Sequence, residues 1–394
     1  MPAPLEGMKI LDFTYLLPGP FATMMLADLG AEIIKIENSE APDMLRLAPP
    51  YVENIGAAYL QVNRGKRSLS LNLKKEEARE IIFRLVKEYD VVVEQFRPGV
   101  MDRLGIGYDA LKAINPSLIF CSLTGYGQTG SYANRAGHDI NYLSLSGLES
   151  FSGRKDTGPS LSGIQIADIA SGSKNLVIGV LAAYACRQRT GRGDRIDVSI
   201  TDGVFAMCAY SVAGYLAGGP EPKREGDILN GGTMYNYYRT ADGEYLAVGA
   251  MEPKFFAAFC EAIGCPEIIP TGIMNWNNKD RVAAIIASKP LAHWKKVFAE
   301  IDACVDPVRS VSEAVSSPPL AEREMIIEIS TLGGNKLRQI GNPIKFASGN
   351  YHASAAGCSI GFHNEEILAE IGYSSDEIAR LIESGAVGKS RTSE

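Results

Sequence analysis

The sequence lacks the features that mark secreted and membrane-spanning proteins. No basic segment followed by an apolar stretch stands near its beginning, so we expect no secretion signal. The longest run without a charged residue covers 203–220 and is rich in Gly, Ala and Ser. We interpret this run as a buried helix, because its composition fits a protein core better than a lipid bilayer. We therefore expect a cytoplasmic protein that does not span a membrane.

Residues that commonly bind metals are few and scattered. The 394 residues include 7 cysteines and 4 histidines, and no two cysteines have the CxxC spacing of zinc and redox sites. Cysteines with this distribution are typical of reduced core thiols in a cytoplasmic protein. We expect no metal site and no disulfide framework.

Positive charge is also in deficit. The net charge is −7, which disfavours broad binding to nucleic acid. Hydrophobic residues make up 46% and charged residues 22% of the chain, as in ordinary soluble globular proteins. The length favours two or three domains.

Alternating strand and helix patterns fill the first half of the chain. Residues 8–13 predict a buried strand, 21–29 a helix that ends at Gly30, and 31–36 a second strand. This is a βαβ unit, whose strands are parallel. Further strands are predicted at 68–73, 90–93, 118–123 and 195–199, which together indicate an α/β fold with a Rossmann-like parallel sheet. The turn after the first strand has no GxGxxG motif, so a nicotinamide cofactor is not supported.

A change of composition near 218–222 predicts a domain boundary. The sequence Gly-Gly-Pro-Glu-Pro reads as a linker, and 221–310 mixes short strands with helices, which indicates a smaller α+β domain. Residues 311–394 are expected to return to the large domain that begins with 1–220.

Two segments carry the strongest candidates for chemistry. His138 follows Gly137 at the predicted start of one apolar helix, and Asp168 ends a short apolar run where another helix begins. Imidazole suits proton transfer near neutral pH, and a partly desolvated carboxylate is a stronger base or nucleophile. The alternatives are a structural hydrogen bond for His138 and an N-cap for Asp168.

Three other charged residues are weaker candidates. Glu252 stands between a predicted strand and Pro253, where an acidic residue often simply favours a helix start. Arg64 and Arg97 lie in loops beside predicted strand ends, which is where α/β folds bind ligands and where phosphate groups would meet guanidinium donors. Solvated surface charge is the alternative for both.

Blocks of sequence along nearly the whole chain resemble the family III CoA-transferase superfamily, of the CaiB/BaiF type. The resembling blocks are 5–12, 18–20, 27–32, 63–67, 96–105, 124–128, 194–203 and 242–246. The resemblance implies an acyl-CoA-processing enzyme that binds its CoA thioester as a substrate, with no retained cofactor. It also implies an interlocked homodimer, with the active site between the large domain of one chain and the small domain of its partner. CoA would lie against Leu16, Pro18, Arg64, Arg97 and Gly137.

Two blocks, 137–142 and 248–255, are similar to those of the α-methylacyl-CoA racemases within that family. The similarity implies that His138 and Asp168 are an acid/base pair, that Glu252 is hydrogen-bonded to His138, and that Asp139 and Tyr142 support them. The expected reaction is racemisation of a 2-methylacyl-CoA through an enolate.

Two other functions stay open at this point. Asp168 also matches the covalent nucleophile of the CoA-transferases, which move CoA from an acyl-CoA to a carboxylic acid. The third possibility is a non-catalytic partner subunit of such an enzyme, which the joint presence of His138, Asp168 and Glu252 argues against.

Overall fold

The computed structural model describes residues 2–390 of the chain, which fold into two compact units. The first unit comprises Met1–Tyr142, Ile164–Val204 and Pro319–Glu394, and the second comprises Leu143–Gly163 and Phe205–Pro318. The chain therefore enters the second unit twice, and its last 76 residues from Pro319 onward belong to the first.

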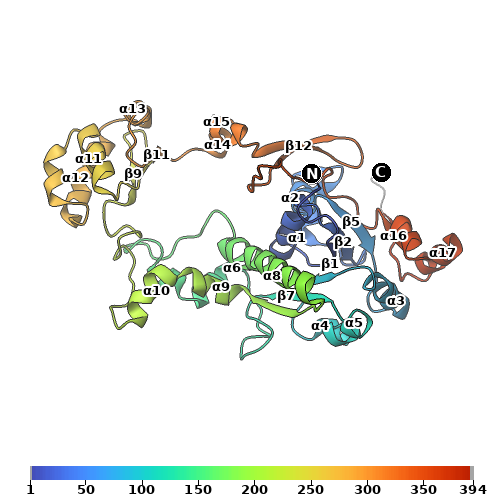
Figure 1. The fold of residues 1–394 in the computed structure, drawn as a ribbon. Coiled ribbons are helices and arrows are strands. Elements are labelled where there is room, and N and C mark those ends of the chain that lie inside the picture. The colour runs from blue at the N-terminus through green and yellow to red at the C-terminus, as the bar shows by residue number, and fades with distance from the viewer. Residues whose placement is uncertain (1, 391–394) are drawn as a thin grey trace. The chain divides into compact units, whose positions relative to one another are not determined.

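A six-stranded parallel sheet forms the centre of the first unit, so the chain has the mixed α/β architecture expected from the sequence (Figure 1). The strand order is β5-β2-β1-β6-β7-β8. The strands are β1 (Lys9–Phe13), β2 (Glu32–Glu37), β5 (Lys66–Ser70), β6 (Val91–Glu94), β7 (Ile119–Thr124) and β8 (Arg195–Ser199).

Helices pack against this sheet because its strands are apolar on both faces. Leu11, Ile34 and Leu69 belong to one hydrophobic core, with side chains from α3 (Glu76–Leu85), α5 (Tyr108–Ile114) and α17 (Ser375–Glu383). Their strand neighbours Ile10 and Ile33 are also fully buried, and alternate residues point to opposite faces. The other helices of this unit are α1 (Pro18–Asp28), α2 (Ala57–Val62), α4 (Val100–Arg103), α6 (Asp139–Leu145), α8 (Lys174–Thr190) and α16 (Asn364–Glu370).

The turn after α1 shows why a glycine is needed there. Gly30 has φ +99°, and a Cβ on it would lie 2.3 Å from the Cβ of Ala3. The left-handed conformation and the lack of space both exclude larger residues, which confirms Gly30 as the stop of this helix.

The returning chain covers the edge of the sheet at β5. The N–H of Ser70 donates to Asn364 Oδ1 at 2.8 Å, and the N–H of Ser68 donates to His363 Nδ1 at 3.1 Å. Val387 forms an antiparallel bridge with Leu71. A hairpin of β12 (Ile326–Ser330) and β13 (Lys336–Ile340) precedes this segment and packs on Tyr59 and Leu60.

The second unit has its own sheet and core. Its antiparallel sheet has the order β11-β10-β9, formed by β9 (Asn236–Arg239), β10 (Tyr245–Val248) and β11 (Val305–Pro307). Its main helices are α10 (Ala209–Leu216), α11 (Pro253–Ala262), α12 (Lys279–Ala287) and α13 (Leu291–Val297). The interpretation of 203–220 as a buried helix is wrong, because α10 has no buried residue. Phe259, Trp294 and Ile286 are buried at the centre of a separate hydrophobic cluster.

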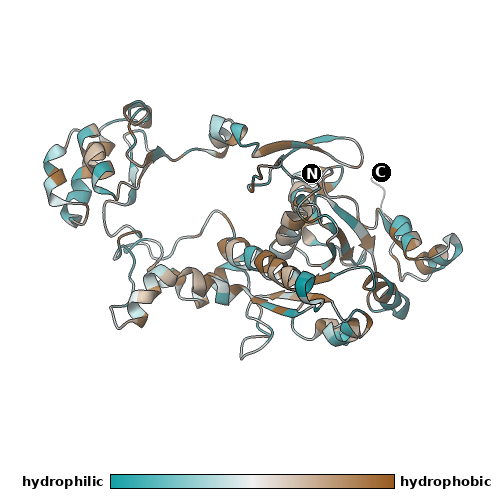
Figure 2. Ribbon diagram, viewed as in Figure 1, coloured by the Kyte–Doolittle hydropathy of each residue, from teal (hydrophilic) through white to brown (hydrophobic). Residues whose placement is uncertain are grey.

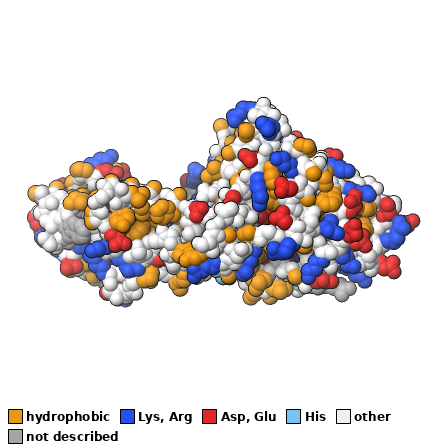
Figure 3. All heavy atoms as spheres, turned by 90° about the horizontal axis from the view of Figure 1, so that it is seen from below, with side chains coloured by type: hydrophobic (Ala, Val, Ile, Leu, Met, Phe, Trp, Pro, Cys, Tyr) orange, Lys and Arg blue, Asp and Glu red, His pale blue; other side chains and the backbone are white. Residues whose placement is uncertain are grey.

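One helical stretch of the described chain, Ala167–Thr190, is long and apolar enough to cross a membrane by length and composition alone. Core helices of globular proteins pass the same test, and its α8 portion packs on β7 and β8. Figure 2 shows apolar residues along much of α8 and a polar end. Apolar side chains also reach the surface in patches among charged ones (Figure 3).

Candidate active site

The order of the strands reverses between β1 and β6. The chain moves outward in one direction through β1, β2 and β5, and in the other through β6, β7 and β8. In open α/β sheets, ligands bind at such a reversal point, outside the carboxyl ends of the strands. The segments that follow β1 and β6 here are 14–17 and 95–99, which include Leu16 and Arg97.

These two segments are joined by direct contacts. The N–H of Gly19 donates to Gln95 Oε1 at 3.0 Å, and the rings of Tyr15 and Phe96 lie 6.1 Å apart. A Cβ on Gly19 would lie 2.3 Å from the Cβ of Thr14 and 2.6 Å from Gln95 Oε1, so only glycine fits. Leu16 has φ +59°, a conformation that costs energy for a residue with a side chain.

Asp168 lies in the first turn of a π-helix, η2 (Ala167–Ser173), which continues into α8. The N-cap position is Ile166, so the alternative that Asp168 caps a helix is wrong. The N–H of Asp168 donates to Asp139 Oδ1 at 3.0 Å. The Oγ–H of Ser173 donates to Asp168 O at 3.0 Å and to Pro18 O at 2.7 Å. π-helical turns are rare and frequently occur at functional sites.

The carboxyl group of Asp168 is prepared for proton transfer. Burial, and to a lesser extent the nearby carboxylate of Asp139, raise its pKa from 3.8 to about 7. Both causes disfavour the charged form, since a buried carboxylate loses hydration and a second negative charge repels it. A pKa close to neutrality is the value at which a carboxyl group serves well as both a base and an acid.

We expect Asp139→Asn to move the pH profile of the enzyme to lower pH. The asparagine keeps an oxygen that accepts the N–H of Asp168 but removes the negative charge that raises its pKa. The acidic limb of kcat/KM, which we expect near pH 7 in the wild type, then shifts downward. A limb that stays in place or rises would contradict the assignment of Asp168 as the base.

The carboxyl group of Asp168 also makes the stability of the protein depend on pH. Because the native state raises the pKa of Asp168 above 3.8, it binds more protons than the unfolded chain between pH 4 and 7. The contribution of Asp168 to the free energy of unfolding therefore decreases as the pH rises through this window.

His138 immediately precedes helix α6. Its N–H donates to Asn141 Oδ1 at 3.0 Å, and its carbonyl accepts the N–H of Asn141 at 2.8 Å. These bonds involve only the backbone of His138, so the alternative of a structural hydrogen bond from the ring finds no support within the described residues. The imidazole is exposed. Since Asp139 is the next residue and accepts the bond from Asp168, the segments carrying His138 and Asp168 lie side by side.

Tyr142 and Gly137 pack next to the segment that carries His138. The hydroxyl of Tyr142 donates to Gly137 O at 2.5 Å, and its ring packs edge-on against Tyr126 with centroids 5.3 Å apart. A Cβ on Gly137 would lie 2.6 Å from the Tyr126 hydroxyl and 2.7 Å from the Tyr142 ring. Burial, and then the carboxylate of Asp168, raise the pKa of Tyr142, so its hydroxyl stays protonated and able to donate.

The two predicted CoA-binding arginines have different surroundings. Arg64 is 1% exposed, and its guanidinium forms a bidentate ion pair with Asp28 at 2.5 and 2.8 Å and donates to Ile340 O. These partners leave Arg64 no free edge for a phosphate, so we assign it a structural role. Arg97 is exposed in the loop after β6 and has no ion pair among the described residues. It is available for an anionic ligand.

The remaining predicted residue, Glu252, belongs to the second unit. It occupies the N-cap position of α11 without a side-chain capping bond, and its carboxylate is exposed. The interpretation that Glu252 only favours the start of a helix therefore leaves its exposed carboxylate without an explanation. Within residues 2–390, no three His, Cys, Asp or Glu side chains are grouped so as to hold a metal ion.

Sequence reasoning missed three contributors to this site. Gln95 and Ser173 tie the segments together, and Tyr15 packs on the loop after β6. The reversal of strand order that brings these loops together depends on tertiary structure and has no local signal. The helix predicted over 21–29 begins three residues earlier, at Pro18, which occupies its first position.

The family model for CoA-transferase family III matches residues 5–364. The chain belongs to this family. Family III relatives include the human (Homo sapiens) alpha-methylacyl-CoA racemase, 35% identical over 383 residues that cover 96% of each chain. The acetyl-CoA:oxalate CoA-transferase of Acetobacter aceti is 36% identical over 354 residues, covering 87% of this chain and 89% of the relative. The crystal structure of a CaiB/BaiF family protein from Brucella suis has a TM-score of 0.82 at 30% identity, covering 94% of this chain and 100% of the other.

These findings confirm the resemblance drawn from the sequence blocks. The CaiB/BaiF fold and the six-stranded parallel sheet agree, and the relatives in family III include both racemases and transferases. Membership in family III therefore establishes an enzyme of the CoA-transferase superfamily. Identities of 35% and 36% to the two types do not separate racemisation from transfer.

Proposed function

We propose that this protein is a racemase or epimerase of 2-methylacyl-CoA thioesters. The observation that carries the proposal is the carboxyl group of Asp168, whose pKa is about 7 and whose backbone is bonded to the residue next to His138. A carboxyl group with this pKa and an imidazole therefore lie on adjacent segments, and both are groups that serve in general acid–base catalysis.

The reaction needs a base on one side of the α-carbon and an acid on the other. One group removes the α-proton, and the electrons of the C–H bond move to the thioester oxygen to form an enolate. The second group returns a proton to the opposite face, which inverts the centre. In the reverse direction, His138 and Asp168 exchange roles.

The proposed place for the CoA thioester is the reversal point between β1 and β6. There the thioester would lie against the loop 14–17, with Leu16 and the following Pro18, and against the loop 95–99. Arg97 supplies an exposed cation for the phosphate groups. CoA is a substrate here, and the proposed reaction requires no retained cofactor or metal.

We further propose that the chain forms a homodimer and works in the cytoplasm. Large apolar side chains are exposed on α8, α9 (Ile200–Met207) and α10, including Ile178 (63%), Tyr210 (64%) and Leu216 (73%), and such surfaces mark contacts with other proteins. In this arrangement Glu252 comes to His138 from the partner. The seven free thiols fit a reducing compartment.

Light scattering measures the proposed association directly. We expect a mass twice that of the chain across the micromolar range. A monomer with full activity would contradict the dimer and the proposed origin of Glu252.

CoA transfer is the second candidate, because Asp168 is also suited to nucleophilic attack. Its carboxylate would attack the thioester carbonyl and expel the CoA thiolate, which leaves a mixed anhydride. The thiolate would then attack the Asp168 carbonyl, release the first acid and form a CoA thioester on Asp168. A second carboxylic acid would take the CoA through another anhydride. The transferases among the relatives support this alternative.

An exchange assay in heavy water distinguishes the candidates. A racemase replaces the α-hydrogen of a 2-methylacyl-CoA with deuterium without any acceptor acid, whereas a transferase requires the acid and leaves the α-hydrogen in place. We expect exchange accompanied by loss of optical purity. Transfer without exchange would favour the second candidate, and neither reaction would indicate a non-catalytic subunit.

A further inference from the structure

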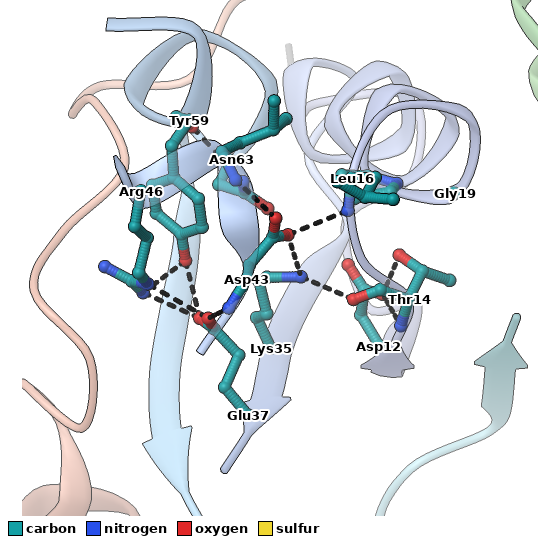
Figure 4. A network of polar contacts seen from close by, with 12 residues as sticks. Asp12, Thr14, Leu16, Gly19, Lys35, Glu37, Asp43, Arg46, Tyr59 and Asn63 are labelled. Carbon is teal, nitrogen blue, oxygen red and sulfur yellow. Dashed lines mark hydrogen bonds and ion pairs between the residues drawn. The ribbon is translucent and has the colours of Figure 1, made fainter. Parts of the chain in front are cut away.

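Four charged side chains are buried beneath the loop that follows β1. Asp12, Lys35, Asp43 and Lys66, which we call the buried quartet, are each at most 5% exposed, and together they carry two acidic and two basic groups. Figure 4 shows Asp12, Lys35 and Asp43. Burying charges costs free energy unless they are paired and hydrogen-bonded, and apolar residues often serve as well for stability alone. The hydrogen-bond partners of these four side chains indicate a role besides stability.

One half of the quartet holds the start of the loop. Lys66 Nζ lies 3.0 Å from Asp12 Oδ2 and donates to Pro20 O at 3.0 Å. Asp12 Oδ1 accepts the N–H of Thr14 at 2.9 Å and its hydroxyl at 2.5 Å. Although burial acts in the opposite direction, Lys66 and Lys35 hold the pKa of Asp12 below its ordinary value, so it stays ionised.

The other half holds the middle of the loop. Lys35 Nζ donates to Thr14 O at 2.6 Å and lies 3.7 Å from Asp43 Oδ2. The same oxygen of Asp43 accepts the N–H of Leu16 at 3.0 Å. This is the residue with φ +59°, so the carboxylate supports a backbone conformation that would otherwise relax.

We propose that the buried quartet is a positioning device that fixes the loop 14–17 in the conformation that receives the CoA thioester. Three backbone groups of the loop, Thr14 N, Thr14 O and Leu16 N, bond to side chains of the quartet, and hydrogen bonds of charged groups are stronger than neutral ones. The loop then leads into Pro18, whose carbonyl shares the Ser173 hydroxyl with Asp168 O. The quartet therefore sets the position of the loop that leads to the segment carrying Asp168.

This inference rests on the proposed function only in that the ligand is a CoA thioester. Its test uses free coenzyme A as the probe and calorimetry as the measurement, so it applies equally to a racemase and a transferase. If wild-type protein bound no coenzyme A, the proposed function would fail. If it bound coenzyme A and the variants bound it equally well, only the positioning role would fail.

Three variants separate positioning from folding. Lys35→Met and Asp43→Asn each leave one buried charge unbalanced, so we expect both to lower Tm. The double variant Lys35→Met/Asp43→Asn is neutral again, because Asp12 and Lys66 remain paired. We expect the double variant to regain Tm while the loop still lacks its bond from Lys35 and the charge that supports Leu16.

We expect the double variant to regain stability without regaining its affinity for coenzyme A. A loop that occupies its binding conformation one tenth of the time weakens apparent affinity about tenfold, and we expect at least this loss of coenzyme A affinity in the double variant. KM for the thioester should rise similarly, with little change in kcat. A double variant with restored Tm and wild-type affinity would overturn the proposal.

Asp28→Asn is the matched control. Asp28 is buried and paired with Arg64 at the opposite end of α1, and neither contacts the loop 14–17. We expect it to lower Tm as much as the single quartet variants and to leave coenzyme A affinity unchanged. Equal losses of affinity in Asp28→Asn and the quartet variants would show that general destabilisation is the cause, which would also overturn the proposal.

Discussion

We expect replacement of Asp168 with Asn to abolish any CoA transfer and to lower α-hydrogen exchange about a thousandfold, the usual contribution of a positioned base. The side chain keeps its size and its place in η2, while the backbone bond to Asp139 does not involve it. An amide neither removes a proton nor forms an anhydride. The measurement is deuterium incorporation at the α-carbon together with formation of a new thioester from an acceptor acid.

The same variant provides its own control for folding. Since burial and Asp139 disfavour the ionised form of Asp168, a neutral amide should make the protein more stable above pH 7, where the wild type carries the charge. We expect Tm at pH 8 to be unchanged or higher. Exchange at the wild-type rate in a folded Asp168→Asn protein would exclude Asp168 as the base.

His138→Ala separates the two candidate reactions. In a racemase the imidazole serves one face of the α-carbon, so its loss should slow exchange from that face and racemisation by roughly a hundredfold to ten-thousandfold. Transfer through Asp168 requires no second base, so a transferase should keep most of its activity. The variant is expected to fold normally, because the imidazole is exposed and only the backbone of His138 bonds to Asn141.

His293→Ala is the control for this variant. His293 is exposed on α13 and has no assigned role in the reaction, so its removal should leave exchange unchanged. If His138→Ala retained exchange and racemisation at the wild-type rate, the imidazole would not be part of the acid/base pair. If it lost transfer as well, the histidine would act in binding.

The sequence was sufficient for the fold class because its signals are local. Strand alternation, the proline at the start of α1 and the glycine after it define the first βαβ unit within a few residues. The unit to which a segment belongs has no such local signal. The segment 143–163 joins the second unit through contacts that are distant in sequence, such as the ion pair between Arg154 and Glu225.

The surroundings of the candidate residues could not be predicted from the sequence. Arg64 looked like a phosphate ligand because it stands in a basic turn, yet Asp28, 36 residues away, binds its guanidinium. Asp168 looked like a helix cap, and the π-helical turn that replaces the cap has no recognised sequence signal. Charge pairing and helix type at these positions depend on tertiary contacts.

The closure of β5 by the returning chain has a consequence for biosynthesis. The acceptors for the N–H groups of Ser68 and Ser70 are His363 and Asn364, and Val387 follows still later. A nascent chain that has not reached these residues carries the edge of its sheet unpaired, and unpaired edges invite association with other chains. The ribosome must therefore deliver almost the entire polypeptide before the edge of the sheet at β5 is protected.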